Sequence, residues 1–185
     1  MIGRDGYMIP KKIHYCWFGK GKKSKLALKC IRSWRQYCPE YEVIEWNEEN
    51  FDIDMNGYTR MCYAEKKYAY LSDYVRLWVV EKYGGIYFDT DVEVIRSLEE
   101  LLRNDAFFCF ENKQYVASGL GFGSVAHGKV IQAMLKEYEI LLDGKNGVRM
   151  CPKLNTQALV ALGLKQNGRK QNVCEAVIYL SLIHI

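Results

Sequence analysis

The stretch Tyr83–Val94, YGGIYFDTDVEV, decides how the fold is interpreted. Two glycines end a strongly apolar segment, a short apolar run follows, and that run stops at two aspartates separated by one threonine. This order predicts a helix over about 68–83, a buried strand over 86–88 and an acidic turn over 89–91. Residues 92–95, Val-Glu-Val-Ile, are predicted to form a strand leaving the turn.

The segments before this stretch predict a strand, a helix and a second strand. Residues 13–18 are apolar and aromatic, and they lead into a lysine-rich loop over 19–25. Apolar side chains then recur every three to four positions over 26–34, with Ser24 as the expected helix cap. Residues 41–46, YEVIEW, alternate between apolar and polar side chains, which predicts a second strand. A strand, a helix and a strand in this order favour parallel pairing with a right-handed crossover.

The other segments complete an α/β pattern. They predict a turn-rich acidic stretch over 47–58, a short helix over 97–102 whose Ser97 and Glu100 fit a capping box, a strand over 106–111, a glycine-rich stretch over 117–124, and helices over 129–142 and 156–164. We therefore expect an α/β fold with a Rossmann-like, mostly parallel central sheet flanked by helices.

Composition excludes several classes of protein. Of the 185 residues 49% are hydrophobic and 26% are charged, which excludes a disordered chain. The net charge of +4 is too small to indicate nucleic-acid binding. No apolar run reaches the ~18 residues of a membrane helix, and because the first residues form no apolar h-region we expect no secretory signal. We expect a cytoplasmic protein with at most peripheral contact at the inner face of a membrane. The 7 cysteines form no C-x-x-C pair, which favours buried, reduced thiols.

The acidic turn predicts a metal site. Asp89 and Asp91 lie two residues apart, so on extended backbone both carboxylates point to one side and can share a cation. Ligands that are all oxygen favour Mg²⁺ or Mn²⁺. Open α/β sheets also bind ligands at the carboxyl ends of their strands. The alternative is an ordinary solvated turn.

The helix before the turn carries a second charged pair. Asp73 and Arg76 are three residues apart and therefore share one face of an otherwise apolar segment. Arginine can clamp a diphosphate or sugar oxygens, and aspartate can accept hydrogen bonds from sugar hydroxyls. A structural ion pair is the alternative.

Three segments together carry a family resemblance. They are IPKKIHYCWFG at Ile9–Gly19, SDYVR at Ser72–Arg76 and YGGIYFDTD at Tyr83–Asp91. In this order and spacing the chain resembles bacterial members of glycosyltransferase family 32, the DXD sugar-binding-region proteins, over about residues 8–178. That group includes capsular-polysaccharide enzymes and relatives of initiation-specific mannosyltransferases. Large clostridial glucosylating toxins resemble it more distantly.

The resemblance implies a GT-A fold that binds a nucleotide-sugar and a divalent metal, Mn²⁺ or Mg²⁺. By similarity, Asp91 ligates the metal that bridges the donor diphosphate, and Asp89 contacts ribose, sugar or the metal through water. Asp73 and Arg76 match the pair that holds the hydroxyls of the donor sugar. Trp17 matches an aromatic residue that stacks on the nucleobase, although a core tryptophan is the alternative.

The implied function is metal-dependent, retaining transfer of a hexose or related sugar. The donor would be a UDP- or GDP-sugar, and the acceptor a hydroxyl of a glycan or lipid-linked saccharide in polysaccharide or capsule biosynthesis. No carboxylate is placed as a nucleophile, so no catalytic base is assigned. A haloacid-dehalogenase-like phosphatase also places D-x-D at a strand end, but Glu93 stands where that motif expects Thr or Val. A truncated, inactive sugar-nucleotide-binding fragment is the non-enzymatic alternative.

The ends of the chain carry separate expectations. We expect residues 8–179 to form a single GT-A-like domain, residues 1–7 an upstream extension and residues 180–185 a non-native tail. The family's closing segment, rich in His, Trp and Ser, has no counterpart before Ile185. We therefore expect the domain to be incomplete at its C-terminus.

Several polar residues have simpler interpretations. Ser118 and Gly119 would allow close backbone approach or form a plain turn. Asn155 begins a predicted helix and fits either a cap or a family segment near the active site. His14 is expected to be a half-buried strand residue. The lysines of the loop over 19–25 fit a solvated loop, and contact with donor phosphates or an anionic membrane surface is the alternative.

Overall fold

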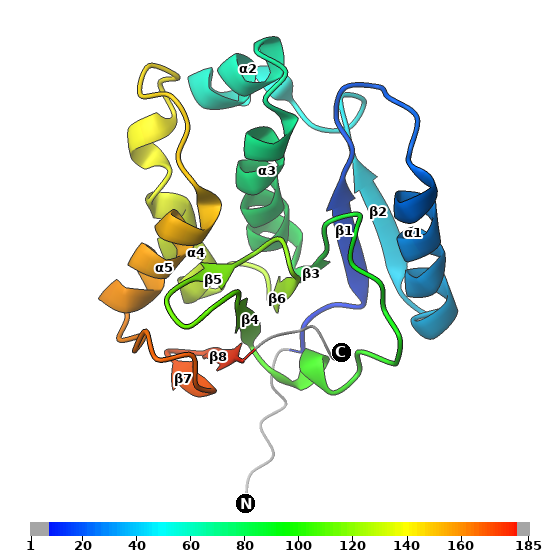
Figure 1. Ribbon diagram of the computed structural model, residues 1–185, viewed down its shortest axis with the longest axis vertical. Helices are drawn as coiled ribbons and strands as arrows, with labels where there is room; N and C mark the ends of the chain where they lie inside the picture. Colours follow the sequence, from blue (N-terminus) through cyan, green and yellow to red (C-terminus); the bar gives the residue numbers. More distant parts are fainter. Residues whose placement is uncertain (1–7, 181–185) are drawn as a thin grey trace, which may run out of the picture.

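The structure is a computed structural model that describes residues 8–180. The expected extension over 1–7 and residues 181–185 of the expected tail lie outside the described residues. Within the described part the chain forms one eight-stranded sheet in the order β2-β1-β3-β6-β4-β8-β7, with β5 beside β4 (Figure 1). None of the helices in residues 8–180 is both long and apolar enough to cross a membrane.

The bounds of the elements are as follows. The strands are β1 Lys12–Cys16, β2 Glu42–Trp46, β3 Gly85–Tyr87, β4 Ala106–Phe110, β5 Val116–Ala117, β6 Phe122–Ser124, β7 Gln171–Val173 and β8 Ala176–Tyr179. The helices are α1 Lys25–Tyr37, α2 Gly57–Ala64, α3 Tyr68–Tyr83, α4 Lys129–Lys136 and α5 Cys151–Ala161, with 3₁₀ turns η1 Ile53–Met55, η2 Leu101–Arg103 and η3 Glu139–Leu141.

The sheet is mixed but mostly parallel, as predicted. β1 pairs in parallel with both β2 and β3, and β4 pairs in parallel with β8. β6 runs antiparallel between β3 and β4, so β4 points the same way as β3. Five of the eight strands in the described residues, namely β1, β2, β3, β4 and β8, therefore share one direction.

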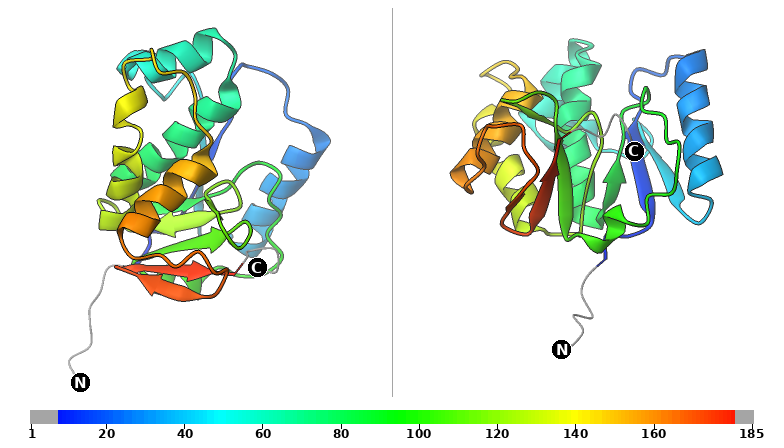
Figure 2. Two further views of the ribbon diagram at one scale, coloured as in Figure 1. Left: turned by 60° about the vertical axis from the view of Figure 1, so that its left-hand side comes forward. Right: turned by 60° about the horizontal axis from the view of Figure 1, so that its bottom comes forward.

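Helices cover the sheet on both faces (Figure 2), and two clusters of buried apolar residues form two cores. Cys30, Ile31 and Trp34 of α1 pack on one face against Ile86 and other buried strand residues. The helices α3, α4 and α5 pack on the other face, which buries Phe108 and Phe110 of β4 and Phe122 of β6. Alternating strand residues feed the two cores in turn, which is the period-2 pattern of a sheet buried on both sides.

A pair of glycines connects α3 to β3. The predicted helix over 68–83 is confirmed with the same bounds, and the chain then turns at Gly84 and Gly85, whose φ angles are +62° and +116°. Side chains rarely adopt such angles, and a Cβ at Gly84 would also meet Pro10 and the backbone of Ala126. The turn fixes where β3 begins and therefore where its carboxyl end delivers the acidic residues.

His14 is fully buried, so the prediction of a half-buried residue was wrong. Its Nε2–H donates to the carbonyl oxygen of Gly84 at 2.8 Å, and its Nδ1 accepts from the indole of Trp46 at 3.1 Å. Both ring nitrogens are satisfied in the neutral tautomer, which allows complete burial. Burial lowers the pKa of His14 from 6.5 to about 4, so the fold selects the uncharged ring.

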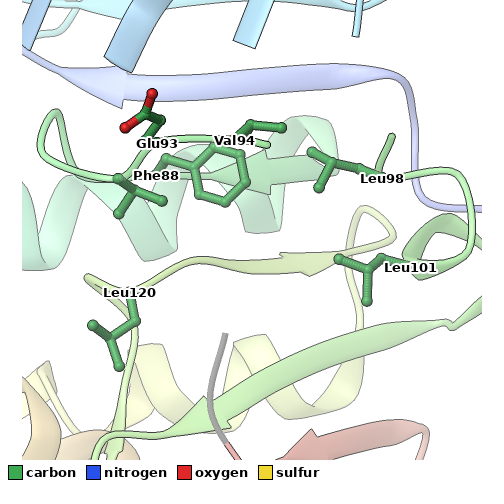
Figure 3. Close-up of a pocket in the computed structure, with 7 residues that line it drawn as sticks. Phe88, Glu93, Val94, Leu98, Leu101 and Leu120 are labelled. Carbon is green, nitrogen blue, oxygen red and sulfur yellow. The ribbon is translucent and has the colours of Figure 1, made fainter. Parts of the chain in front are cut away.

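The predicted strand over 92–95 does not form. The carbonyl oxygen of Val92 accepts from the indole of Trp34 at 2.8 Å, and Val94 N–H donates to Ser33 Oγ at 2.9 Å. Side chains of α1 therefore satisfy this backbone in place of a neighbouring strand. Figure 3 shows the result, a small apolar pocket where Val94 lies beside Phe88.

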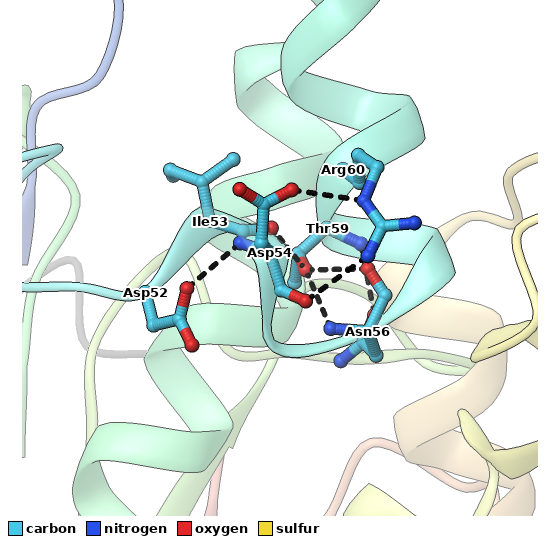
Figure 4. Close-up of polar contacts among 6 residues, drawn as sticks. All are labelled: Asp52, Ile53, Asp54, Asn56, Thr59 and Arg60. Atoms are coloured by element: carbon cyan, nitrogen blue, oxygen red, sulfur yellow. Dashed lines mark hydrogen bonds and ion pairs between the residues drawn. The ribbon is translucent and has the colours of Figure 1, made fainter.

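Two further predictions were wrong: the helix expected over 97–102 does not form, and a helix begins within the stretch over 47–58 that was predicted as turns. Ser97 Oγ accepts from Glu99 N–H at 3.3 Å without forming a capping box, and the 3₁₀ turn η2 begins only at Leu101. Helix α2 forms inside and beyond a stretch predicted as turns. Asn56 accepts from Thr59 N–H at 2.9 Å in a capping box, and Asp54 pairs with Arg60 (Figure 4).

The later helices differ from their predicted bounds. α4 ends at Lys136 and is followed by η3, which together replace the single helix predicted over 129–142. α5 begins at Cys151 with a proline in its first turn, five residues before the predicted start at 156. The cysteines in the described residues are all free thiols, and of these only Cys174 is exposed.

We predict that His14→Gln flattens the pH dependence of stability. A histidine whose pKa falls from 6.5 in the unfolded chain to about 4 in the fold contributes fully above pH 6.5, and this contribution is lost as the pH falls toward 4. Between pH 7.5 and 5 the wild-type chain should lose about 2 kcal/mol from this group alone. Gln can make both hydrogen bonds without titrating. Urea unfolding of both chains at the two pH values measures the difference, and a wild-type–variant gap that does not change with pH contradicts the prediction.

Candidate functional site

A polar cleft of about 330 Å³ opens at the carboxyl end of β3. Four of the five predicted donor-site residues, Asp73, Arg76, Asp89 and Asp91, line it together. The other lining residues come from α3, β4–β5, the loop after β5 and the start of α5, namely Ala69, Glu111, Ala117, Gly119, Leu120, Cys151 and Pro152. The structure therefore brings together side chains that are far apart in the sequence.

Arg76 connects the two acidic segments. Its guanidinium lies 2.7 Å from Asp73 Oδ1 within α3 and 3.3 Å from Asp89 Oδ1 on the turn after β3. Arg76 is only 5% exposed, and its Nε also donates to the carbonyl oxygen of Ser72 at 3.2 Å. Its guanidinium lies over the ring of Tyr87, with Cζ 5.0 Å from the centroid. The arginine thus fixes the distance between helix and acidic turn.

The charges of this group depend on one another. Burial raises the pKa of Asp73, and Arg76 opposes that rise. Burial likewise raises the pKa of Asp89, against the effects of Arg76 and of the hydroxyl of Tyr87. Burial alone would lower the pKa of Arg76, but Asp89 and Asp73 outweigh it and the pKa is raised. The guanidinium therefore stays charged and keeps both carboxylates in the cleft.

Asp89 has one occupied and one open oxygen. Its Oδ1 faces Arg76 and accepts from the hydroxyl of Tyr87 at 3.1 Å. Its Oδ2 faces Gly119, where a Cβ would collide with that oxygen and lie 3.0 Å from Arg76 Nη1. The backbone N–H of Asp89 also donates to the carbonyl oxygen of Gly119 at 3.3 Å. Glycine at 119 is thus explained by the space that the carboxylate needs.

Asp91 differs from Asp89 in its environment. It lies two residues further along the turn and is exposed to solvent, although it lines the same cleft. Its negative charge adds to the rise in the pKa of Asp89, after burial. Two carboxylates that repel each other and share a cleft favour binding of a cation.

Trp17 is not among the residues that line this cleft. It follows β1, is partly exposed, and packs against the apolar core beneath α1. Its indole N–H donates to the carbonyl oxygen of Gly21 at 2.7 Å, and Lys23 Nζ lies 5.4 Å from its ring centroid. Lys23 also pairs with Glu45 at 2.7 Å, so part of the lysine-rich loop is bound to the fold. Stacking of Trp17 on a nucleobase stays a prediction.

Beneath the cleft lies a buried polar cluster. Asn155 Nδ2 donates to Ser118 Oγ and to Cys151 Sγ, each at 3.1 Å. The Oδ1 of Asn155 is buried and has no hydrogen-bond partner among the described residues. Because α5 begins at Cys151, Asn155 lies inside the helix and not at its start, so the capping interpretation was wrong.

Sequence reasoning missed three residues of this site. Tyr87 was read only as part of a buried strand, yet it donates to Asp89 and carries Arg76 on its ring. Cys151 and Glu111 line the same cleft as the acidic turn but are far from it in the sequence. Proline is common in the first turn of a helix, so Pro152 is a signal in the sequence that a helix begins at Cys151. The sequence gives no comparable signal for Glu111.

Comparison with known proteins shows which proteins this chain is similar to in sequence and in fold. Residues 24–108 match the family model described as "Glycosyltransferase sugar-binding region containing DXD motif". The chain is 32% identical over 106 residues to "Inositol phosphoceramide mannosyltransferase 3" of Schizosaccharomyces pombe. That match covers 54% of this chain and 29% of the relative, so the chain spans less than a third of that protein.

Two solved structures have a similar fold. "PaToxG Glycosyltransferase" matches with a TM-score of 0.66 and 18% identity over 83% of this chain and 69% of that one. The "UDP-bound glycosyltransferase domain from the YGT toxin" matches with a TM-score of 0.53 and 11% identity over 87% of this chain and 69% of that one. These likenesses show the fold, and the chain has the GT-A fold that the sequence resemblance implied.

Residues 24–108 are therefore similar to the DXD-containing sugar-binding region of glycosyltransferases, and part of the chain is similar to a mannosyltransferase. GT-A glycosyltransferases with a DXD motif usually use a divalent metal. The haloacid-dehalogenase-like alternative is not favoured.

We predict that Arg76→Met destabilises the fold by about 3 kcal/mol, because it leaves the carboxylate of Asp73 buried without a positive partner. Arg76→Lys should lose less, since it keeps the charge but cannot reach both carboxylates in the same geometry. Adding Asp73→Asn to Arg76→Met should recover part of the loss. Urea unfolding at pH 7 measures all three variants, and a loss below about 1 kcal/mol for Arg76→Met would show that the pairing has little structural weight.

Proposed function

We propose that this chain transfers a hexose or related sugar from a nucleotide-sugar to a hydroxyl of a glycan or lipid-linked saccharide. The proposal includes a UDP- or GDP-sugar donor, dependence on Mn²⁺ or Mg²⁺, and retention of the anomeric configuration. The observation that carries it is the Asp73–Arg76–Asp89 group in one cleft with Asp91, at the carboxyl end of a GT-A strand. Location in the cytoplasm or at the inner face of a membrane stays a prediction.

The acidic turn suits a divalent cation. Asp89 Oδ2 faces the open space left by Gly119, and Asp91 is exposed in the same cleft, so two oxygen ligands are available. No group of three or more His, Cys, Asp or Glu side chains suited to a metal occurs in residues 8–180. Mg²⁺ is commonly held by one or two carboxylates together with substrate phosphates, which matches this pair. When bound, the cation would offset the negative charge of the departing nucleoside diphosphate.

The other residues of the cleft suit recognition of the donor sugar. Asp73 is buried beside Arg76 and can accept hydrogen bonds from sugar hydroxyls, while the guanidinium offers donors toward sugar or phosphate oxygens. Tyr87 keeps Asp89 oriented through its hydroxyl. Because the polar groups are fixed before a ligand arrives, little reorganisation is needed on binding.

The names of similar proteins support the classes of donor and product in this proposal. One solved neighbour is described as UDP-bound, and the curated relative is named a mannosyltransferase of inositol phosphoceramide. These descriptions belong to those proteins. For this chain they support a nucleotide-sugar donor, so the proposed UDP- and GDP-sugars are tested as one panel that includes mannose as the sugar.

We predict that the wild-type chain binds a nucleotide-sugar only with Mn²⁺ or Mg²⁺, and that Asp91→Asn abolishes this binding. At a hundredfold excess of ligand over Kd, binding should stabilise the chain by ~2.7 kcal/mol, which raises Tm by roughly 5–10 °C. A thermal-shift panel of UDP- and GDP-sugars with and without metal measures it. Asp105→Asn is the matched control, because Asp105 is exposed and immediately precedes β4 at the amino end of that strand. No shift with any donor, or an unchanged shift in Asp91→Asn, contradicts the proposal.

We also predict that Gly119→Ala weakens metal-dependent donor binding at least about tenfold, equivalent to ~1.4 kcal/mol. The added Cβ occupies the space of Asp89 Oδ2 and displaces the carboxylate. Gly21→Ala is the control, since a Cβ at Gly21 meets nothing within 4 Å. Calorimetric titration of both variants tests this, and equal affinities for the two would refute the role given to Gly119.

A further inference from the structure

Glu111 lines the same cleft as the proposed donor site but has no role in that site. It directly follows β4, whereas Asp73 and Arg76 lie on α3 and the metal pair lies after β3. Glu111 is exposed, and no ion pair or side-chain hydrogen bond of Glu111 is found within residues 8–180. Its carboxylate is thus an uncommitted acceptor beside the proposed reaction centre.

Hydrogen bonds fix the backbone at Glu111, and with it the point from which the side chain extends. Glu111 N–H donates to the carbonyl oxygen of Tyr115 at 2.8 Å, which closes the hairpin between β4 and β5. Asn112 Oδ1 accepts from Gln114 N–H at 2.9 Å and from Tyr115 N–H at 3.0 Å. Val116 N–H donates to Thr156 Oγ1 of α5 at 2.9 Å, so the hairpin is anchored to a helix whose first residues, Cys151 and Pro152, also line the cleft.

The charge of Glu111 argues against a role in donor binding. Arg76 already pairs with Asp73 and Asp89, and Asp91 is assigned to the cation with Asp89. A fourth carboxylate would repel the diphosphate of a nucleotide-sugar. It is instead well suited to a neutral polyol, because a carboxylate accepts short, charge-assisted hydrogen bonds from hydroxyl groups.

We propose that Glu111 binds the hydroxyls of the acceptor saccharide and so places the acceptor against the donor. The inference rests on the proposed function and adds the acceptor side of the same cleft. The ligand class is a neutral sugar or cyclitol with adjacent hydroxyls. Glu111 acts by binding this ligand, and the donor site remains intact without it.

The test compares Glu111→Gln with wild type in three assays. Donor affinity should be unchanged or slightly tighter, since a repulsive charge is removed. Hydrolysis of the donor by water should stay within about twofold. Transfer to a panel of methyl glycosides and myo-inositol should fall roughly 10–100-fold in kcat/KM, chiefly through a higher acceptor KM, as expected for the loss of a hydrogen bond to a charged group.

Controls separate the acceptor role from folding effects. Glu100→Gln removes another exposed glutamate outside the cleft and should leave all three assays unchanged. Glu111→Asp should retain part of the transfer activity. An equal Tm for Glu111→Gln and wild type excludes a general loss of structure.

A fourth assay distinguishes failure of the proposed sugar transfer from failure of the acceptor role of Glu111. Saturation-transfer NMR with the same methyl glycosides and no donor should give signals with wild type that Glu111→Gln loses. If nucleotide-sugars do not bind but this sugar signal depends on Glu111, the proposed function fails and the binding role of Glu111 stands. If nucleotide-sugars bind while transfer and the sugar signal survive in Glu111→Gln, the acceptor role fails alone. Weaker donor binding in Glu111→Gln would also overturn it, by placing Glu111 in the donor or metal site.

Discussion

The buried guanidinium of Arg76 is the constraint on which the site depends. A charge that is 5% exposed must be balanced nearby, and here the balance comes from Asp73 on the same helix and Asp89 on the neighbouring turn. This requirement ties α3 to the carboxyl end of β3. The tight connection through Gly84 and the missing side chain at Gly119 are conditions for it, because each leaves room for backbone or carboxylate at close distance.

Much of this arrangement could be predicted from local sequence patterns. The apolar segment over 68–83 followed by Gly84 and Gly85 gave the helix its true bounds, since the glycines favour backbone angles that a helix cannot continue. The spacing of Asp73 and Arg76 fixed their shared face, and their ion pair is observed. Parallel pairing of the first two strands also followed from the strand–helix–strand order.

The rest depends on contacts between distant parts of the chain. Glu111 follows β4, which pairs with β6 beside β3, and Cys151 begins α5, where its Sγ lies 3.0 Å from Ser118 Oγ in the segment after β5. The strand predicted over 92–95 does not form, because the side chains of Ser33 and Trp34 make hydrogen bonds to this backbone that a neighbouring strand would otherwise make. Helix α2 was hidden because aspartate, asparagine and glycine are typical both of turns and of helix starts.

The two apolar cores have a consequence for how such a protein can diversify. Arg76 and Tyr87 belong to the face of the sheet that packs against α3, whereas Trp17 rests on the core beneath α1. The sheet separates these cores, so repacking one leaves the contacts of the other largely untouched. If Trp17 contacts the nucleobase, the residues that support selectivity for the base lie in one core, and those that support selectivity for the sugar lie in the other. One can then change across a lineage while the other is preserved.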